Sequence, residues 1–156
     1  MNAEDKNSHD QPATKSEREL YEELDVWSLQ DKDPEFPHQH IADAYAAQHP
    51  EECLRPIRLA FALAGLYLHA EKGVSGRNIQ RLHMTMGRRK QAWPDFEWPD
   101  EDKLRNITVA DALAAKPGPE RSARISEWVK ETWQAWAEVG DNRQLVIDLL
   151  ASYGIV

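Results

Sequence analysis

Three side chains within residues 38–49 have the chemistry and the spacing to form one site. In a helical conformation His38, Tyr45 and His49 share one face, because successive residues turn by about 100°. Asp43 points away from that face. Two imidazole rings and a phenol on one face can line a polar pocket, with the Tyr45 hydroxyl orienting a ligand. We therefore predict a pocket lined by His38, Tyr45 and His49.

A metal centre is the alternative for the same histidines. On a straight helix His38 and His49 are separated by roughly 16 Å, a distance that one ion cannot bridge. Some ligands would have to come from other helices, and the candidates are a subset of His38, His49, His69, His83 and Asp141. A zinc ion or a similar divalent metal held there would activate a bound water molecule, as in metal-dependent enzymes.

Each histidine also has a purely structural interpretation. An imidazole on an inward face usually hydrogen-bonds a backbone carbonyl or a carboxylate, and His40 is expected on the solvated side of its helix. The sequence contains no HExxH zinc motif, no glycine-rich phosphate loop and no GxSxG nucleophile elbow. Cys53 follows Glu51 and Glu52, which disfavour its thiolate. Nucleophilic catalysis therefore finds no support in the sequence.

A row of arginines suggests a third function, the binding of an anion or a nucleic acid. Arg77, Arg81 and Arg88 fall on one side of a predicted helix, in a stretch without acidic residues. The structural alternative is a solvated helix face. The whole chain carries a formal charge of -8, which argues against coating of nucleic acids or docking to an anionic membrane. Any anion site would therefore be local.

The apolar pattern places these candidates on helices. Apolar residues recur at helical spacing, and Ser16, Ser75 and Thr108 have the sequence context of helix N-caps. The predicted helices cover residues 16–33, 38–49, 55–72, 75–87, 108–115, 120–139 and a last segment from 141 onward. No segment shows the alternation of a β-strand. The predicted fold class is therefore all-α, a single-domain helical bundle of about six to seven helices.

Two segments are predicted to lie outside the helices. Residues 1–15 are polar and aperiodic, which is typical of a disordered tail ahead of a single helical domain over 16–156. Residues 91–106 contain two Trp-Pro pairs and favour an ordered aromatic loop. Trp93 and Trp98 in this loop could cover a pocket or a protein partner.

Cysteine usage and hydropathy indicate where the protein works. A single cysteine cannot form an internal disulfide, which is typical of a reducing compartment. The first fifteen residues lack the apolar core of a signal peptide. The longest apolar run, residues 59–68, has about half the length of a bilayer span. We therefore predict a cytoplasmic protein with no membrane association.

One motif resembles the signature of a bacterial domain family of unknown function, His-x4-Asp-Ala-Tyr-x-x-Gln-His-Pro. It is carried here by His38 and by the run DAYAAQHP at 43–50. The segments AGLYL at 64–68 and TVADAL at 108–113 are similar to the family as well. The spacing of Trp128, Trp133 and Trp136 agrees too, so the resemblance covers about residues 20–150.

The resemblance implies no particular activity, because the family carries none that is established. Members often have a cysteine pair near the N-terminus and a His-His pair just after the last tryptophan. This chain has neither, and Val139, Gly140 and Asp141 occupy the second place. If those family positions bind metal together with His38 or His49, this chain lacks part of the site, and Asp141 would substitute as an oxygen ligand.

The sequence therefore supports one preferred function and two rivals. The preferred one is a cytosolic helical module that binds a small ligand in a His/Tyr-lined pocket or binds a protein partner. The first rival is a metal-dependent enzyme that uses His38 or His49 with partners from other helices. The second is anion or nucleic-acid binding through the arginine row.

Overall fold

The computed structural model describes residues 14–89 and 91–155, and all regular structure in them is helical. The bounds are α1 Glu17–Gln30, α2 Pro37–Gln48, the 3-10 turn η1 Pro50–Glu52, α3 Pro56–Lys72, α4 Gly76–Gly87, α5 Glu101–Leu104, α6 Val109–Ala114, α7 Pro119–Ala137 and α8 Asn142–Ser152. The predicted all-α bundle is confirmed. The tail predicted over 1–15 falls outside the described residues, apart from 14 and 15.

The helices begin and end where local chemistry satisfies their free backbone groups. Ser16 Oγ accepts from the Glu19 amide at 3.2 Å, and Ser75 Oγ accepts from the Asn78 amide at 3.3 Å. Thr108 begins α6 with a capping box. Such caps satisfy amides that lack a partner within the helix. Gly73 ends α3 in the left-handed conformation, with φ of 65°, which costs glycine little.

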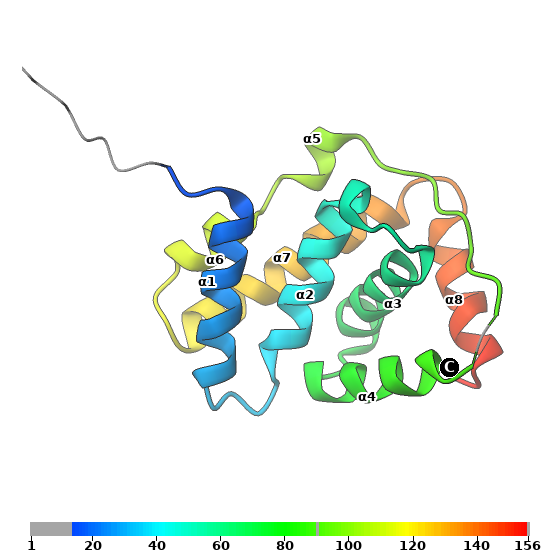
Figure 1. Cartoon of the computed structure of the whole chain (residues 1–156), viewed down its shortest axis with the longest axis horizontal. Coiled ribbons are helices and arrows are strands. Elements are labelled where there is room, and N and C mark those ends of the chain that lie inside the picture. Colours follow the sequence, from blue (N-terminus) through cyan, green and yellow to red (C-terminus); the bar gives the residue numbers. More distant parts are fainter. Residues whose placement is uncertain (1–13, 90, 156) are drawn as a thin grey trace, which may run out of the picture.

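Helix α3 is the centre of the bundle, in contact with α2, α4, α7 and α8 (Figure 1). Residues 62–68 along its middle are all buried, as expected for a helix that is apolar on nearly every side. Trp128 and Trp136 of α7 are fully buried in the same core. The Trp136 indole donates to the Ala47 carbonyl at 3.0 Å. This bond connects α7 to α2, the helix that carries the candidate site.

The predicted aromatic loop over 91–106 is ordered but contains one turn of helix, α5, that the sequence pattern did not predict. Four residues are too few to show a helical period. The buried Asn142 holds the loop through a donated and an accepted hydrogen bond with the backbone of Glu97, at 2.7 and 2.9 Å. The loop is therefore fixed on the bundle beside α8.

The start of α4 is pressed against the turn before α2. The Gly76 amide donates to the Glu35 carbonyl at 2.8 Å. A Cβ at Gly76 would lie 2.0 Å from the Phe36 carbonyl oxygen, so the close approach requires glycine. This contact brings α4 beside the first turn of α2. It thereby places His83 of α4 next to α2.

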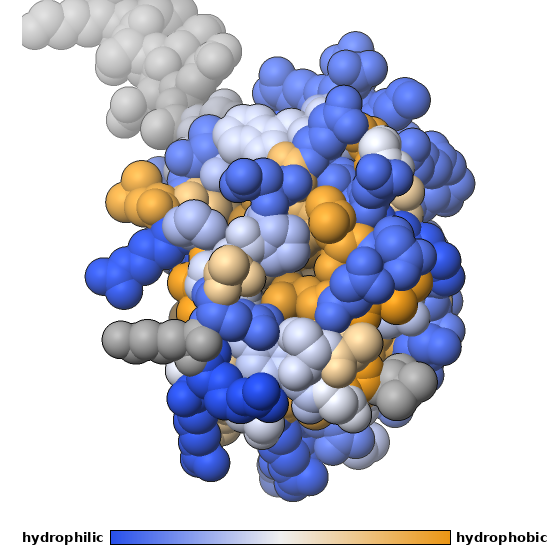
Figure 2. All heavy atoms as spheres, turned by 90° about the vertical axis from the view of Figure 1, so that its right-hand side faces the viewer, coloured by the Kyte–Doolittle hydropathy of each residue, from blue (hydrophilic) through white to orange (hydrophobic). Residues whose placement is uncertain are grey.

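The described helices contain no membrane-spanning candidate, since none is both long and apolar enough to cross a bilayer. The exterior nevertheless has hydrophobic areas. On the side of the molecule where α8 lies, hydrophobic side chains gather in the middle of the face and hydrophilic ones surround them (Figure 2).

Candidate functional site

The face of α2 that carries His38, Tyr45 and His49 packs against α1. The two helices run antiparallel and side by side (Figure 1). Tyr45 stacks on Tyr21 with ring centroids 4.2 Å apart. His38 Nδ1 lies 3.1 Å from Asp25 Oδ1. The ring of His38 therefore lies against the end of α1 and is not among the residues that line the cavity described below.

His49 contacts a carboxyl group of α1 at the other end of this interface. Its Nδ1 donates to the Tyr45 carbonyl at 2.8 Å and its Nε2 contacts Glu17 Oε2 at 2.7 Å. Arg105 donates to the same Glu17 oxygen at 2.7 Å. Burial tends to raise the pKa of Glu17, but the hydrogen bonds from Arg105 and His49 outweigh it and hold the pKa below its ordinary value. With Glu17 ionised, both imidazole nitrogens of His49 face oxygen acceptors, the Tyr45 carbonyl and the Glu17 carboxylate.

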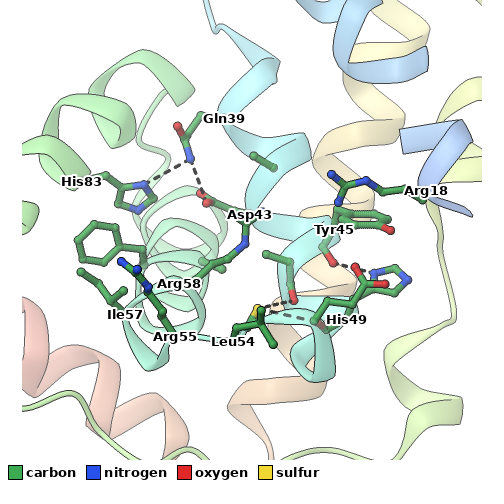
Figure 3. A pocket seen from close by; sticks show the side chains of 16 residues that line it. Arg18, Gln39, Asp43, Tyr45, His49, Leu54, Arg55, Ile57, Arg58 and His83 are labelled. Atoms are coloured by element: carbon green, nitrogen blue, oxygen red, sulfur yellow. Dashed lines mark hydrogen bonds between the residues drawn. The ribbon is translucent and has the colours of Figure 1, made fainter. Parts of the chain in front are cut away.

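A cavity of about 640 Å³ opens on the neighbouring face of α2 (Figure 3). Its walls come mainly from α2, α3 and the segment that joins them, with one residue each from α1 and α4. The residues that line it are Arg18, Gln39, Ala42, Asp43, Tyr45, Ala46, His49, Glu52, Cys53, Leu54, Arg55, Ile57, Arg58, Phe61, Ala62 and His83. Two of the three predicted pocket residues, Tyr45 and His49, therefore line a cavity, and each also contacts α1, through Tyr21 and Glu17.

The polar end of the cavity is organised by one amide. The Gln39 side-chain nitrogen donates to Asp43 Oδ1 at 3.0 Å and lies 3.3 Å from His83 Nδ1 (Figure 3). Burial lowers the pKa of His83 to about 4, opposed by the Phe61 backbone carbonyl, so the ring is neutral at pH 7. Its Nδ1 then accepts from Gln39, and the ring proton resides on Nε2.

Asp43 is a buried carboxyl in the wall between α2 and α3. Burial raises its pKa well above the ordinary value, and the Gln39 hydrogen bond and the charge of Arg58 only partly oppose this. Asp43 Oδ2 is sealed from solvent and has no hydrogen-bond partner in the described chain. A Cβ at Gly65 would lie 1.9 Å from this oxygen. The carboxyl therefore fits only because α3 has glycine at that position.

Cys53 lies in the cavity wall close to the end of α2. Its thiol is within reach of the Ala46 carbonyl at 3.5 Å and of the His49 carbonyl at 3.8 Å. Burial raises the pKa of Cys53 above its ordinary value. The thiol form is therefore favoured, as expected from the acidic neighbours Glu51 and Glu52, and a nucleophilic role is not supported.

The candidate metal ligands lie in separate environments. His69 is half-buried: its Nδ1 donates to the Val74 carbonyl at 3.1 Å, and its ring centroid is 3.9 Å from that of His40. Asp141 is exposed at the start of α8. Across residues 14–89 and 91–155, no three His, Cys, Asp or Glu side chains are arranged to hold a metal ion. The predicted ligand set of His38, His49, His69, His83 and Asp141 is thus not brought together.

His40 corrects a further expectation, since it is buried rather than solvated. Burial and the neighbouring His69 lower the pKa of His40 to about 3. The two rings fill space between α2 and α3. Both histidines are therefore packing residues that remain neutral at pH 7.

The arginine row lies on the outside of α4, away from the cavity. Arg77, Arg81 and Arg88 are all exposed. The Arg77 guanidinium lies over the Phe36 ring at 5.3 Å from its centroid. Of the loop tryptophans, Trp98 is 55% exposed, whereas Trp93 packs edge-on against Phe61 with centroids 5.5 Å apart.

Sequence reasoning missed the residues that form most of the cavity. Gln39, Ala42, Asp43 and Ala46 have the i, i+3, i+4, i+7 spacing of one helix face, about 100° round from the predicted one. The sequence signal for this face was two short side chains, Ala42 and Ala46, beside two polar ones, Gln39 and Asp43. The residues of each pair are four positions apart. Chemically, the arrangement offers an apolar space with a neutral hydrogen-bonded end and a basic mouth.

The protein is therefore an all-α single-domain protein with a cavity between α2 and α3. The model of a family of unknown function (DUF5946) matches residues 11–137. The chain belongs to this family. The search of curated proteins and the search of solved structures gave no match. The resemblance to a family of unknown function is therefore right, and the individual motif positions remain predictions.

Proposed function

We propose that this protein binds a small organic molecule in the cavity between α2 and α3. The observation that carries the proposal is the cavity itself, whose volume of about 640 Å³ is that of a small-molecule site.

The chemistry of the walls supports a ligand with a substantial apolar part. Ala42 and Ala46 leave space on the α2 side because their side chains are short. Ile57, Phe61 and Ala62 give an apolar surface on the α3 side. Apolar walls supply most of the binding free energy of a small ligand, and a few polar groups orient it.

The geometry favours ligand binding over the rival functions. An enzyme that used His38 or His49 with a metal would need partners that the described chain does not bring near them. The exposed Trp98 keeps a protein contact open as a second role, although Trp93 is occupied by Phe61. Action in the cytoplasm remains part of the proposal, on the argument from the single cysteine.

Titration with N-phenyl-1-naphthylamine, a neutral fluorescent probe with two aromatic parts, tests the proposal. Wild-type protein should show saturable fluorescence enhancement. Ala42→Phe fills the cavity and should weaken binding about tenfold or more, which is about 1.4 kcal/mol. Ala123→Phe adds the same ring to an exposed position of α7 and should bind like the wild type.

Thermal unfolding of both variants establishes that they are folded before their binding is compared. If no saturable binding occurs, or if Ala42→Phe and Ala123→Phe bind equally well, the cavity is not a ligand site and the proposal is wrong.

A further inference from the structure

We infer that the ligand is an organic anion, whose charged group is held by Arg55 and Arg58 at the mouth of the cavity and whose apolar part enters between α2 and α3. This inference rests on the proposed function and adds the chemical class of the ligand. Figure 3 shows both arginines at the α3 side of the cavity, beside Ile57.

The mouth of the cavity has more positive than negative groups. Arg55 and Arg58 line it, and Glu52 is the exposed acid among the lining residues. Arg18 also lines the cavity, but it is paired with Glu22 at 3.3 Å. This excess is local, because the whole chain has a formal charge of -8. A concentration of positive charge at one opening of an acidic protein selects anionic over cationic ligands.

The buried end of the cavity does not neutralise these arginines. Burial raises the pKa of Asp43 and favours its uncharged form, and burial lowers the pKa of His83 to about 4. Asp43 Oδ2 and His83 Nε2 are also sealed from solvent, so a ligand does not reach them. The charges available to a ligand are therefore those at the mouth.

The position of Arg58 is central. Its charge opposes the burial that raises the pKa of Asp43, of Cys53 and of Tyr21. Two of these groups, Asp43 and Cys53, line the cavity, so the charge of Arg58 acts on the cavity wall itself. Its positive charge therefore attracts an anion that enters the cavity.

Arg55 and Arg58 have no ion-pair partner among the described residues, whereas other arginines of the chain do. Arg105 pairs with Glu17 at 2.7 Å, and Arg143 pairs with Glu71 at 2.7 Å. An arginine already paired with a carboxylate has little to offer a second anion. The planar fork of an unpaired guanidinium instead forms two parallel hydrogen bonds with a carboxylate, phosphate or sulfonate.

The experiment compares two probes that share one ring system and differ by a single sulfonate group. 8-Anilinonaphthalene-1-sulfonate has the ring system of N-phenyl-1-naphthylamine with a sulfonate added. Wild-type protein should bind the sulfonate more tightly than the neutral probe. The double variant Arg55→Gln/Arg58→Gln should lose about tenfold in affinity for the sulfonate and keep its affinity for the neutral probe.

The exposed arginines of α4 give a matched control. Arg77→Gln/Arg81→Gln removes the same total charge at a distance from the cavity, and should bind both probes like the wild type. Ala42→Phe should weaken the binding of both probes, which places the sulfonate in the cavity and not on the surface. Each variant is checked by circular dichroism and thermal unfolding.

Equal loss in the two arginine double variants, or no loss in either, overturns the inference. In both cases the proposed function stands if the neutral probe binds wild-type protein and is weakened by Ala42→Phe. Absence of neutral-probe binding removes the proposed function itself. Displacement of the sulfonate by 1-naphthoate or by 1-naphthyl phosphate then distinguishes a carboxylate ligand from a phosphate ligand.

Discussion

Replacing Gly65 by alanine tests how α2 and α3 fit together at the cavity. The new Cβ would lie 1.9 Å from Asp43 Oδ2, whereas a carbon and an oxygen in contact are about 3.3 Å apart. The carboxyl would have to move by roughly 1.4 Å, away from a buried position in which Gln39 holds it at 3.0 Å. The strain therefore falls on two helices of the core.

The expected loss follows from three contributions. Overpacking of a core costs about 1–3 kcal/mol, and losing the hydrogen bond from Gln39 to Asp43 costs about 1 kcal/mol. The higher helix propensity of alanine returns about 1 kcal/mol. We expect Gly65→Ala to lower the free energy of unfolding by about 2 kcal/mol, and the melting temperature by about 4–8 °C for a protein of this size.

Urea and thermal unfolding measure this loss against a matched control. A Cβ at Gly87 would meet only Phe61, at 3.9 Å, so Gly87→Ala should be neutral or slightly stabilising. Asp43→Ala removes the clashing carboxyl, and adding Gly65→Ala to that background should then cost at least about 1 kcal/mol less. The reasoning is refuted if Gly65→Ala is as stable as Gly87→Ala, or if the Asp43→Ala background gives no relief.

Three further predictions concern ionisable groups. Because the folded-state pKa of Asp43 is raised above its ordinary 3.8, wild-type protein should lose stability relative to Asp43→Asn as pH rises above 3.8, in thermal unfolding from pH 3.5 to 8. The pKa of His40 falls from 6.5 to about 3 on folding, so wild-type protein should lose more stability than His40→Phe as pH drops from 6.5 to 3, measured in the same way. Glu17→Gln leaves the buried His49 without its carboxylate and should lower the free energy of unfolding by about 2 kcal/mol at pH 7, measured with urea. Folding lowers the pKa of Glu17 below its ordinary 4.5. The difference in stability between the two proteins should therefore shrink as the pH falls through and below 4.5.

Local signals in the sequence were sufficient for most of the fold. The caps at Ser16, Ser75 and Thr108 and the left-handed Gly73 act within one turn of chain, so residue identity alone determines them. The single turn α5 has no such signal. Its position depends on packing against α7, which the neighbouring residues do not encode.

The predicted face of α2 supplies two residues of the cavity, Tyr45 and His49, and the adjacent face of α2 supplies the others from that helix. A helical wheel shows which residues share a face, but it does not show which helix meets that face. His38 and Tyr45 face α1, where Asp25 and Tyr21 meet them. The cavity occupies the adjacent face because alanines there leave space. Which of the two faces stays open depends on the packing of α3, a long-range property.

His40 shows the same limit for burial. Its sequence neighbours suggested a solvated position, but His69 from α3 packs against it with the two rings tilted and their centroids 3.9 Å apart. The contact joins residues far apart in the chain, and no local pattern predicts it. Arg55 and Arg58 were missed for a related reason, since their importance comes from the cavity beside them and not from their spacing.

Cys53 gives the cavity wall one thiol to which a compound can be attached covalently. A chain with one cysteine offers any disulfide-bearing fragment a single point of attachment, and here that point borders the proposed binding space. Because burial raises the pKa of this thiol, exchange with fragments is slow at neutral pH. Compounds that react there in preference to a free thiol would be those that the surrounding walls hold in place, so tethering can select a ligand whose identity is not known in advance.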